Sequence, residues 1–206
     1  SIYRFACMLL EGAAASPKRG NTETFSLLLN MEQIFERFIA AIVKSSVAPQ
    51  IGATPHSQGE GERRYLFRDR STGKEVLRLK PDLLIEHGDK RLVVDTKWKA
   101  FPKGKPARPT NDDLYQLYAY LRAHDCQRVY LLYPQVEGVK PRTLEALDHG
   151  DKVRGEVGVR FVDLNRKLWT REGKALLTQD LESIIREGLG LPAQRQRAEP
   201  AGEVTA

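Results

Sequence analysis

The stretch from Leu79 to Lys99 reads LKPDLLIEHGDKRLVVDTKWK, and its pattern decides the fold. It predicts two short apolar strands, Asp82–Glu86 and Arg91–Trp98, joined by a turn over the sequence HGDK. If the turn is centred on its Gly-Asp pair, antiparallel pairing places Asp82 opposite Asp95, with Cβ atoms roughly 5 Å apart. Two like charges at that distance repel each other on a half-buried sheet, so the sequence requires a compensating cation there.

Lys97 follows Asp95 by two residues and therefore lies on the same face of the predicted strand. Two carboxylates and one ammonium on one sheet face predict a divalent-metal site with a cation beside it. The alternative is a surface ladder of ion pairs. Leu83–Ile85 and Leu92–Val94 are continuous apolar runs, which are typical of a sheet covered on both faces, and they favour the buried metal site.

Three segments in one order carry a family resemblance. The Pro81-Asp82 pair followed by Asp95-Thr96-Lys97 resembles the core motif of the PD-(D/E)xK nuclease superfamily. More narrowly, the segments together are similar to the McrC-like nuclease subunits of the McrBC modified-cytosine restriction system. The resemblance covers about residues 16–170 and rests on Lys80–Asp82, Val94–Lys99, Asn111–Tyr120 and the upstream helix Leu28–Phe38. It implies an α/β fold with a mixed central sheet flanked by helices, as in restriction endonucleases.

The resemblance also assigns roles to the central residues. Asp82 and Asp95 are expected to bind one or two Mg²⁺ ions, for which Mn²⁺ can substitute, and the backbone carbonyl of Thr96 is expected to add a ligand. Lys97 is expected to orient the attacking water and to stabilise the transition state of phosphodiester hydrolysis.

Glu36 lies in the strongest helical pattern of the chain, which runs from Phe25 to Ser46. It sits beside the apolar stripe of that helix rather than on its polar face. The pattern alone favours a boundary glutamate paired with Arg37 or with solvent. The resemblance favours a third carboxylate at the metal site, bound directly or through water.

Gln116 and Tyr120 are four residues apart on a predicted helix, Asn111–His124, and therefore share a face. Thr110 and Asp113 precede them as a capping box with aspartate in place of the usual Glu or Gln. The alternative is that Gln116 is a boundary residue of the helix and Tyr120 is a core residue. Q-x-x-x-Y after D-x-K resembles RecB-like and McrC-like nucleases, which implies that the pair orients the site lysine and contacts the nucleic acid.

A formal net charge of +6 favours a polyanionic partner, although charge alone is a weak indicator. The loop from Phe101 to Thr110 is basic and follows the D-x-K triplet, so it is well placed to hold backbone phosphates. A solvated loop is the alternative. The residues expected to bind nucleic acid are Lys99, Lys103, Lys105 and Arg108.

The rest of the chain completes the domain. We expect a loop over Pro49–Arg63, followed by a hairpin of Tyr65–Arg68 and Glu75–Leu79 that continues into the central strands as an antiparallel meander. Further predicted elements are a strand at Arg128–Tyr133, parallel to the Asp95 strand, a strand at Val157–Leu164 and an amphipathic helix at Lys174–Gly188. Residues 1–15 are interpreted as the end of a preceding helical region, 16–191 as the nuclease domain and 192–206 as a disordered tail.

These patterns predict a Mg²⁺-dependent DNA endonuclease subunit, with a McrB-like AAA+ GTPase as the partner that the resemblance implies. A RecB-like repair or exonuclease domain and a catalytically silent nucleic-acid-binding module remain as alternatives. No Walker-type GxxxxGK[ST] motif and no G-x-S-x-G motif occurs in the sequence. No apolar run is long enough to span a membrane and no signal peptide is evident, so a cytoplasmic location is expected.

Overall fold

A computed structural model describes residues 30–61, 63–99 and 101–193 of the chain. Its helices and strands all belong to one compact unit that begins at Met31. The predicted helical region 1–15, the start of the predicted helix at Phe25 and nearly all of the tail from 192 lie outside the described residues. The helical elements are α2 (Met31–Ile42), a π-helical turn (Val43–Val47), α3 (Ala48–Ile51), α4 (Asn111–Ala123) and α5 (Arg171–Leu189).

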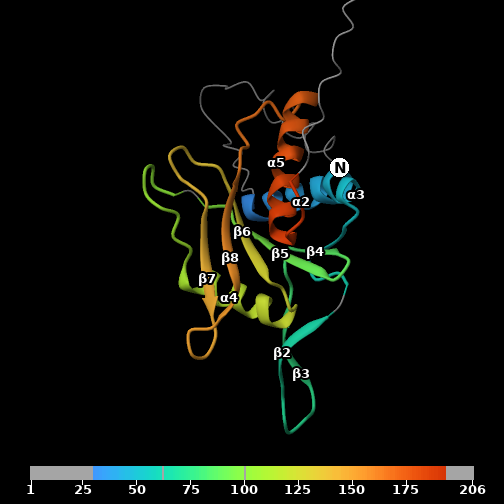
Figure 1. The fold of residues 1–206 in the computed structure, drawn as a ribbon. Helices are drawn as coiled ribbons and strands as arrows, with labels where there is room; N and C mark the ends of the chain where they lie inside the picture. The colour runs from blue at the N-terminus through green and yellow to red at the C-terminus, as the bar shows by residue number, and fades with distance from the viewer. Residues whose placement is uncertain (1–29, 62, 100, 194–206) are drawn as a thin grey trace, which may run out of the picture. The chain divides into compact units, whose positions relative to one another are not determined.

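A six-stranded mixed sheet forms the centre of this unit (Figure 1). Its spatial order is β1-β4-β5-β6-β8-β7. β5 pairs in parallel with β6, and β6 with β8, whereas the pairs β1–β4, β4–β5 and β7–β8 are antiparallel. The strands are β1 (Thr54–Ser57), β4 (Leu83–His87), β5 (Lys90–Thr96), β6 (Arg128–Pro134), β7 (Arg142–Leu147) and β8 (Val153–Val162).

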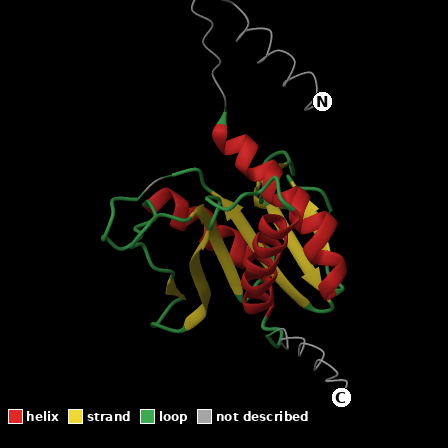
Figure 2. Ribbon diagram, turned by 90° about the horizontal axis from the view of Figure 1, so that it is seen from above, coloured by secondary structure: helices red, strands yellow, loops and turns green. Residues whose placement is uncertain are grey.

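Each face of the sheet is covered by its own apolar cluster. On one face Leu92 and Val94 pack with residues of α2 and α5, and on the other Val93 packs with residues of α4. Figure 2 shows α2 and α5 crossing the sheet. Strand alternation explains this division, because neighbouring residues of β5 point to opposite faces. The prediction of a mixed α/β sheet covered by helices on both faces is therefore confirmed.

The central hairpin has the predicted register. Leu83 pairs with Val94 and Ile85 with Leu92, so one further step places Asp82 across from Asp95. The predicted strand at Arg128–Tyr133 and its parallel pairing with β5 are also confirmed. The final helix ends at Leu189, and Gly190 caps it in the left-handed conformation.

The sequence predicted a loop over Pro49–Arg63, but part of this segment is helical and part forms a strand. The first long helix continues through a π-helical turn and α3 as far as Ile51, and Thr54–Ser57 then forms β1, which pairs with β4. The sequence of β1 has no strand pattern because β1 is an edge strand. It pairs with one neighbour only, so it tolerates proline and polar residues. The Nε2 atom of His56, in this strand, lies 3.1 Å from Oε2 of Glu86.

The predicted antiparallel meander of three or four strands is also wrong. β2 (Arg64–Arg68) and β3 (Glu75–Leu79) form the expected hairpin, but as a separate two-stranded sheet. β1 occupies the edge of β4 that β3 would have needed. The Lys80-Pro81 step separates β3 from β4. The edge strand β7 was missed because most of its side chains are exposed and it lacks an apolar run.

Candidate active site

Asp82 lies directly before β4, and its carboxylate reaches across to the end of β5. Its Oδ2 accepts two hydrogen bonds of 2.7 Å from Thr96, one from the backbone N–H and one from the hydroxyl. Burial raises the pKa of Asp82 above its ordinary value and outweighs these hydrogen bonds. The two hydrogen bonds thus fix the orientation of the Asp82 carboxylate, but they do not fully offset the cost of burying its negative charge.

Asp95 is one of the most deeply buried charged side chains described, with 2% of its surface exposed. The ammonium of Lys97 lies 2.8 Å from its Oδ2 and forms an ion pair with it. Burial, followed by the negative charge of Asp82, raises the pKa of Asp95 to about 6. Two carboxylates in each other's field are therefore held beside a single ammonium.

Lys97 begins a chain of contacts that leads away from the carboxylates. Its Nζ lies 3.4 Å from Gln116 Oε1, and Gln116 Nε2 donates a bond of 2.9 Å to the hydroxyl of Tyr120. Tyr120 in turn donates to the carbonyl of Lys80, two residues before Asp82. Burial lowers the pKa of the Lys97 ammonium, but the charges of Asp95, Asp113 and Asp82 outweigh it and raise the pKa overall. Lys97 is thus a cation held in place from α4.

Glu36 projects from α2 on the same side as Asp82. Its Oε1 accepts a bond of 2.9 Å from Gln58, and burial together with the charge of Asp82 raises its pKa. The rings of Phe35 and Trp98, with centroids 5.6 Å apart, join α2 to the end of β5. The neighbouring Glu32 adds a further negative charge near Asp82, which the sequence analysis did not identify.

Asp113 is a second site residue that sequence reasoning missed. It completes the predicted capping box with Thr110, and its Oδ2 also lies 3.1 Å from Lys99 Nζ. Its Oδ1 lies 3.8 Å from Lys97 Nζ, so one carboxylate faces both lysines of the motif. Burial raises its pKa, but the hydrogen bonds from Thr110 and Lys99 outweigh burial and lower the pKa overall. Its spacing of three before Gln116 was the available signal, because i and i+3 share a helix face.

The predicted nucleic-acid-binding residues lie in and before the loop that follows β5. Lys99 pairs with Asp113, and Lys103 pairs with Glu137, whereas Lys105 and Arg108 are exposed. Phe101 anchors the loop through edge contacts with Tyr133 and Phe161. Two of the four cations are therefore already engaged with carboxylates.

The structure brings together Asp82, Asp95, Thr96, Lys97, Gln116 and Tyr120 as a connected group, with Glu36 beside Asp82. Within the described ranges, no three His, Cys, Asp or Glu side chains are arranged to hold a metal ion together. Gln58 and Thr96 instead hold the carboxylates of Glu36 and Asp82, and Lys97 that of Asp95. The three-carboxylate metal site stays a prediction. No helix in the same ranges has the length and apolarity to cross a membrane.

Comparison with known proteins places the chain in a family. The model of the family described as "McrBC 5-methylcytosine restriction system component" matches residues 1–134, well over half of the chain. No curated protein matches. Among solved structures, the chain is similar to Pyrococcus furiosus SfsA in complex with Ca²⁺, with 18% identity over 70% of this chain and 75% of that chain. The TM-score of that pair is 0.29, which is too low to support any inference.

The matched residues include all of the central hairpin and the Gln116–Tyr120 helix, on which the resemblance to McrC rests. The chain belongs to the McrBC 5-methylcytosine restriction system component family.

Proposed function

We propose that this chain is a Mg²⁺-dependent DNA endonuclease subunit of a McrBC-type restriction system, with a PD-(D/E)xK active site. The observation that supports this most directly is the grouping of Asp82, Asp95 and Lys97 at the open end of the central hairpin. Family membership supports the restriction system. The nuclease chemistry is inferred from the side chains.

The donor set fits a divalent cation. Burial raises the pKa of both Asp82 and Asp95, and the charge of Asp82 raises that of Asp95 further, so a second positive charge beside them is favourable. The Lys97 ammonium contacts one oxygen of Asp95, and a carboxylate offers about four lone-pair sites, so Asp95 keeps sites for a ligand bond. Carboxylate oxygens are the ligands that Mg²⁺ and Mn²⁺ prefer. Asp82, Asp95 and the Thr96 carbonyl would hold the ion, with Glu36 completing the set.

When bound, the ion would lower the pKa of a coordinated water and offset charge on the phosphate. Lys97 is held at the carboxylate pair by Asp95 and Gln116, so its ammonium can contact the attacking water and the phosphoryl oxygens. Its raised pKa keeps it protonated at neutral pH, which suits an electrostatic role. Gln116 and Tyr120 fix its position, and Lys105 and Arg108 can contact backbone phosphates.

A McrB-like GTPase is proposed as the partner, because the family is that of a two-component restriction system and the sequence contains no nucleotide-binding motif. In this division of labour the partner supplies GTP hydrolysis and this chain supplies cleavage. Co-purification of the full-length product with an AAA+ GTPase tests the assignment, and a preparation without such a partner counts against it.

The decisive experiment compares Mn²⁺ binding and DNA cleavage in the same variants. Asp95→Asn and Asp82→Asn should each weaken Mn²⁺ binding in calorimetric titration by at least tenfold and abolish cleavage. Asp89→Asn is the matched control, since Asp89 is an exposed turn residue of the same hairpin. Unchanged Mn²⁺ binding in Asp95→Asn would favour a silent nucleic-acid-binding module. Cleavage of linear but not circular DNA would favour the RecB-like exonuclease.

A further inference from the structure

The β2–β3 hairpin carries much of the positive charge of the chain. Residues 63–80 include seven Lys or Arg and two acidic residues, which leaves five net positive charges, against six for the whole sequence. Figure 1 shows the two strands extending away from the six-stranded sheet as a narrow ribbon. None of the site residues proposed above lies within the ribbon, so its charge is unexplained by the active site.

One face of the ribbon packs against the apolar cluster beneath α4, and the other face is exposed to solvent. Leu66 and Leu79 join the apolar cluster under α4. Phe67 and Val76, directly opposite each other across the two strands, have 62% and 47% of their surface exposed. A cross-strand pair of exposed apolar side chains among basic residues indicates a surface that binds another molecule.

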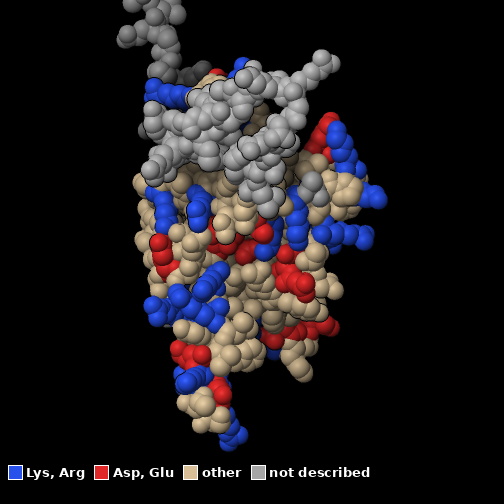
Figure 3. Space-filling model, turned by 180° about the vertical axis from the view of Figure 1, so that it is seen from behind, with Lys and Arg blue, Asp and Glu red and all other residues tan. Residues whose placement is uncertain are grey.

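The tip of the ribbon is ordered by its own hydrogen bonds. Asp69 accepts bonds from the backbone N–H groups of Ser71 and Thr72 and from the Ser71 hydroxyl, and Gly73 adopts a positive φ of 69°. These bonds lower the pKa of Asp69 and use its charge within the turn. Arg70 and Lys74, exposed at the tip, form no ion pair with any described residue. Figure 3 shows the ribbon as the narrow lower arm, with basic side chains at its end.

The base of the ribbon is tied to the candidate site. Lys80 ends the ribbon two residues before Asp82, and its carbonyl accepts the hydrogen bond of Tyr120. Arg78 donates a bond of 2.7 Å to the carbonyl of Gly59. A ligand gripped by the ribbon is therefore held in a fixed relation to the two carboxylates.

We propose that the β2–β3 ribbon inserts into the major groove of duplex DNA next to the bond that is cut. The proposal rests on the proposed nuclease function and names the part of the substrate that the chain holds. Arg70 and Lys74 would contact backbone phosphates, and Phe67 with Val76 would contact the base edges and thymine methyl groups. The substrate class that this surface recognises is double-stranded rather than single-stranded DNA.

The dimensions favour this groove. Two paired strands are about 5 Å apart and each five-residue strand is about 17 Å long, so the ribbon with its side chains fits a major groove about 12 Å wide. The minor groove, about 6 Å wide, is too narrow for it. A preformed turn also means that little conformational entropy is lost on insertion.

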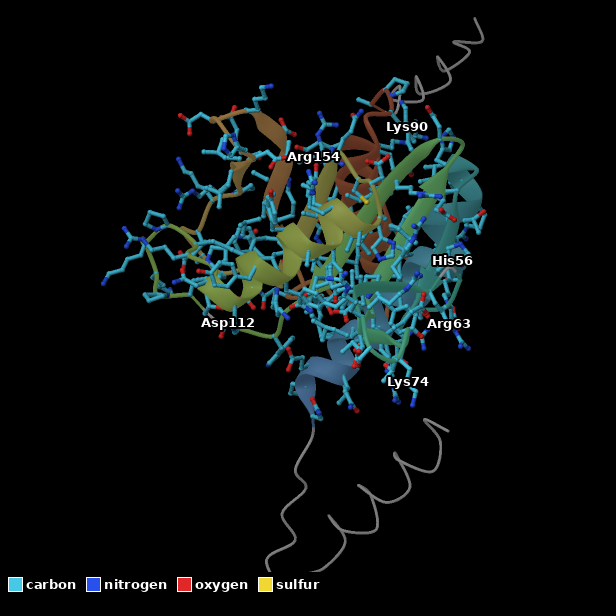
Figure 4. The ribbon with its side chains drawn as sticks, turned by 90° about the horizontal axis from the view of Figure 1, so that it is seen from below. His56, Arg63, Lys74, Lys90, Asp112 and Arg154 are labelled. Carbon is cyan, nitrogen blue, oxygen red and sulfur yellow. The ribbon has the colours of Figure 1, made fainter. Side chains whose placement is uncertain are left out.

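The test measures binding of a labelled 30-base-pair duplex, and of one of its single strands, in EDTA so that no cleavage occurs. Arg70→Ala/Lys74→Ala should weaken duplex binding by about tenfold and reduce the slope of log K against log salt by nearly 2. Phe67→Ser should weaken duplex binding without changing that slope. The charge-matched control is Lys90→Ala/Lys152→Ala, which removes two exposed lysines elsewhere on the domain. Figure 4 shows Lys90 far from Lys74.

Each outcome bears on the proposal separately from the nuclease assignment. Single-strand binding, and hydrolysis of a small phosphodiester such as bis(p-nitrophenyl) phosphate, should be unchanged in the ribbon variants. Ribbon variants that bind duplex as tightly as the control, or that lose single-strand binding equally, overturn the groove proposal and leave the active site standing. A wild-type protein that binds no duplex overturns the groove proposal, and its hydrolysis of the small phosphodiester then decides the active site. Loss of small-substrate hydrolysis in Asp95→Asn alone supports the active site independently.

Discussion

The hydroxyl of Tyr120 donates a hydrogen bond of 3.0 Å to the backbone carbonyl of Lys80. Tyr120 lies on α4 and Lys80 ends the β2–β3 ribbon, so one side chain joins the two structures that flank the candidate site. The same hydroxyl accepts a bond from Gln116, which in turn contacts Lys97. The position of the ammonium therefore depends on a residue that touches neither carboxylate.

Tyr120→Phe should remove this link without emptying the space that the ring fills. We expect a loss of about 1 kcal/mol in the free energy of unfolding, because the Lys80 carbonyl loses its donor, and about a tenfold loss of duplex cleavage. Urea unfolding and a cleavage assay measure both. Tyr133→Phe is the matched control, since the buried Tyr133 hydroxyl makes no hydrogen bond to any described residue, and it should be neutral or slightly stabilising.

Lys97→Met should separate cleavage from metal binding. The change keeps most of the side-chain volume but removes the ammonium that lies 2.8 Å from Asp95. Cleavage should fall by at least a hundredfold because the transition state loses its cation. Mn²⁺ affinity, measured by calorimetry, should stay the same or increase, since Asp95 no longer has a competing positive charge. Retained nicking of plasmid DNA by this variant would show that the role assigned to Lys97 is wrong.

The pH dependence of stability should report on Asp95. Its pKa is raised to about 6, whereas in the unfolded chain the group has an ordinary pKa of about 3.9. Between these values Asp95 binds more protons in the folded state than in the unfolded state, so its contribution to stability falls as pH rises from about 4 to 6. In EDTA we expect this to cost on the order of 2 kcal/mol, measured by urea unfolding.

Asp95→Asn should lack this pH-dependent loss and should be more stable than the wild type above pH 6 in EDTA. Divalent metal should reverse the order, because it binds the ionised pair and stabilises only the wild type. Mn²⁺ affinity of the wild type should fall below pH 6, where protons compete for the same carboxylates. Equal pH profiles for the two proteins in EDTA would contradict the assigned pKa.

The local sequence pattern predicted the centre of the candidate site. It did not predict the elements whose structure depends on long-range contacts. Asp82 and Asp95 could be placed opposite each other because one short turn fixes the register of β4 and β5. β1 could not be found, since TPHS has no strand pattern and becomes a strand only against the edge of β4. The same reason explains the wrong meander, because the choice between β1 and β3 as partner is made in three dimensions.

The missed role of Asp113 has a similar origin. As a sequence feature it was a capping residue, and the structure confirms the cap. Its second role depends on Lys99, which follows β5 and reaches the start of α4. Nothing in the spacing of these two residues predicts that contact, because it follows from the parallel crossover that brings α4 over the sheet.

Asp113→Ala tests both roles of that carboxylate. The loss of the capping box should cost about 1 kcal/mol in the free energy of unfolding, and Asp113→Asn, which keeps an acceptor for the Thr110 N–H, should cost less. Both variants release Lys99 from its ion pair, so duplex affinity in EDTA should rise two- to threefold. Asp112→Ala removes the same charge from the adjacent exposed position and controls for net charge. If Asp112→Ala raises the affinity equally, Lys99 is not held back by Asp113, and the charge of the helix start alone sets the affinity for DNA.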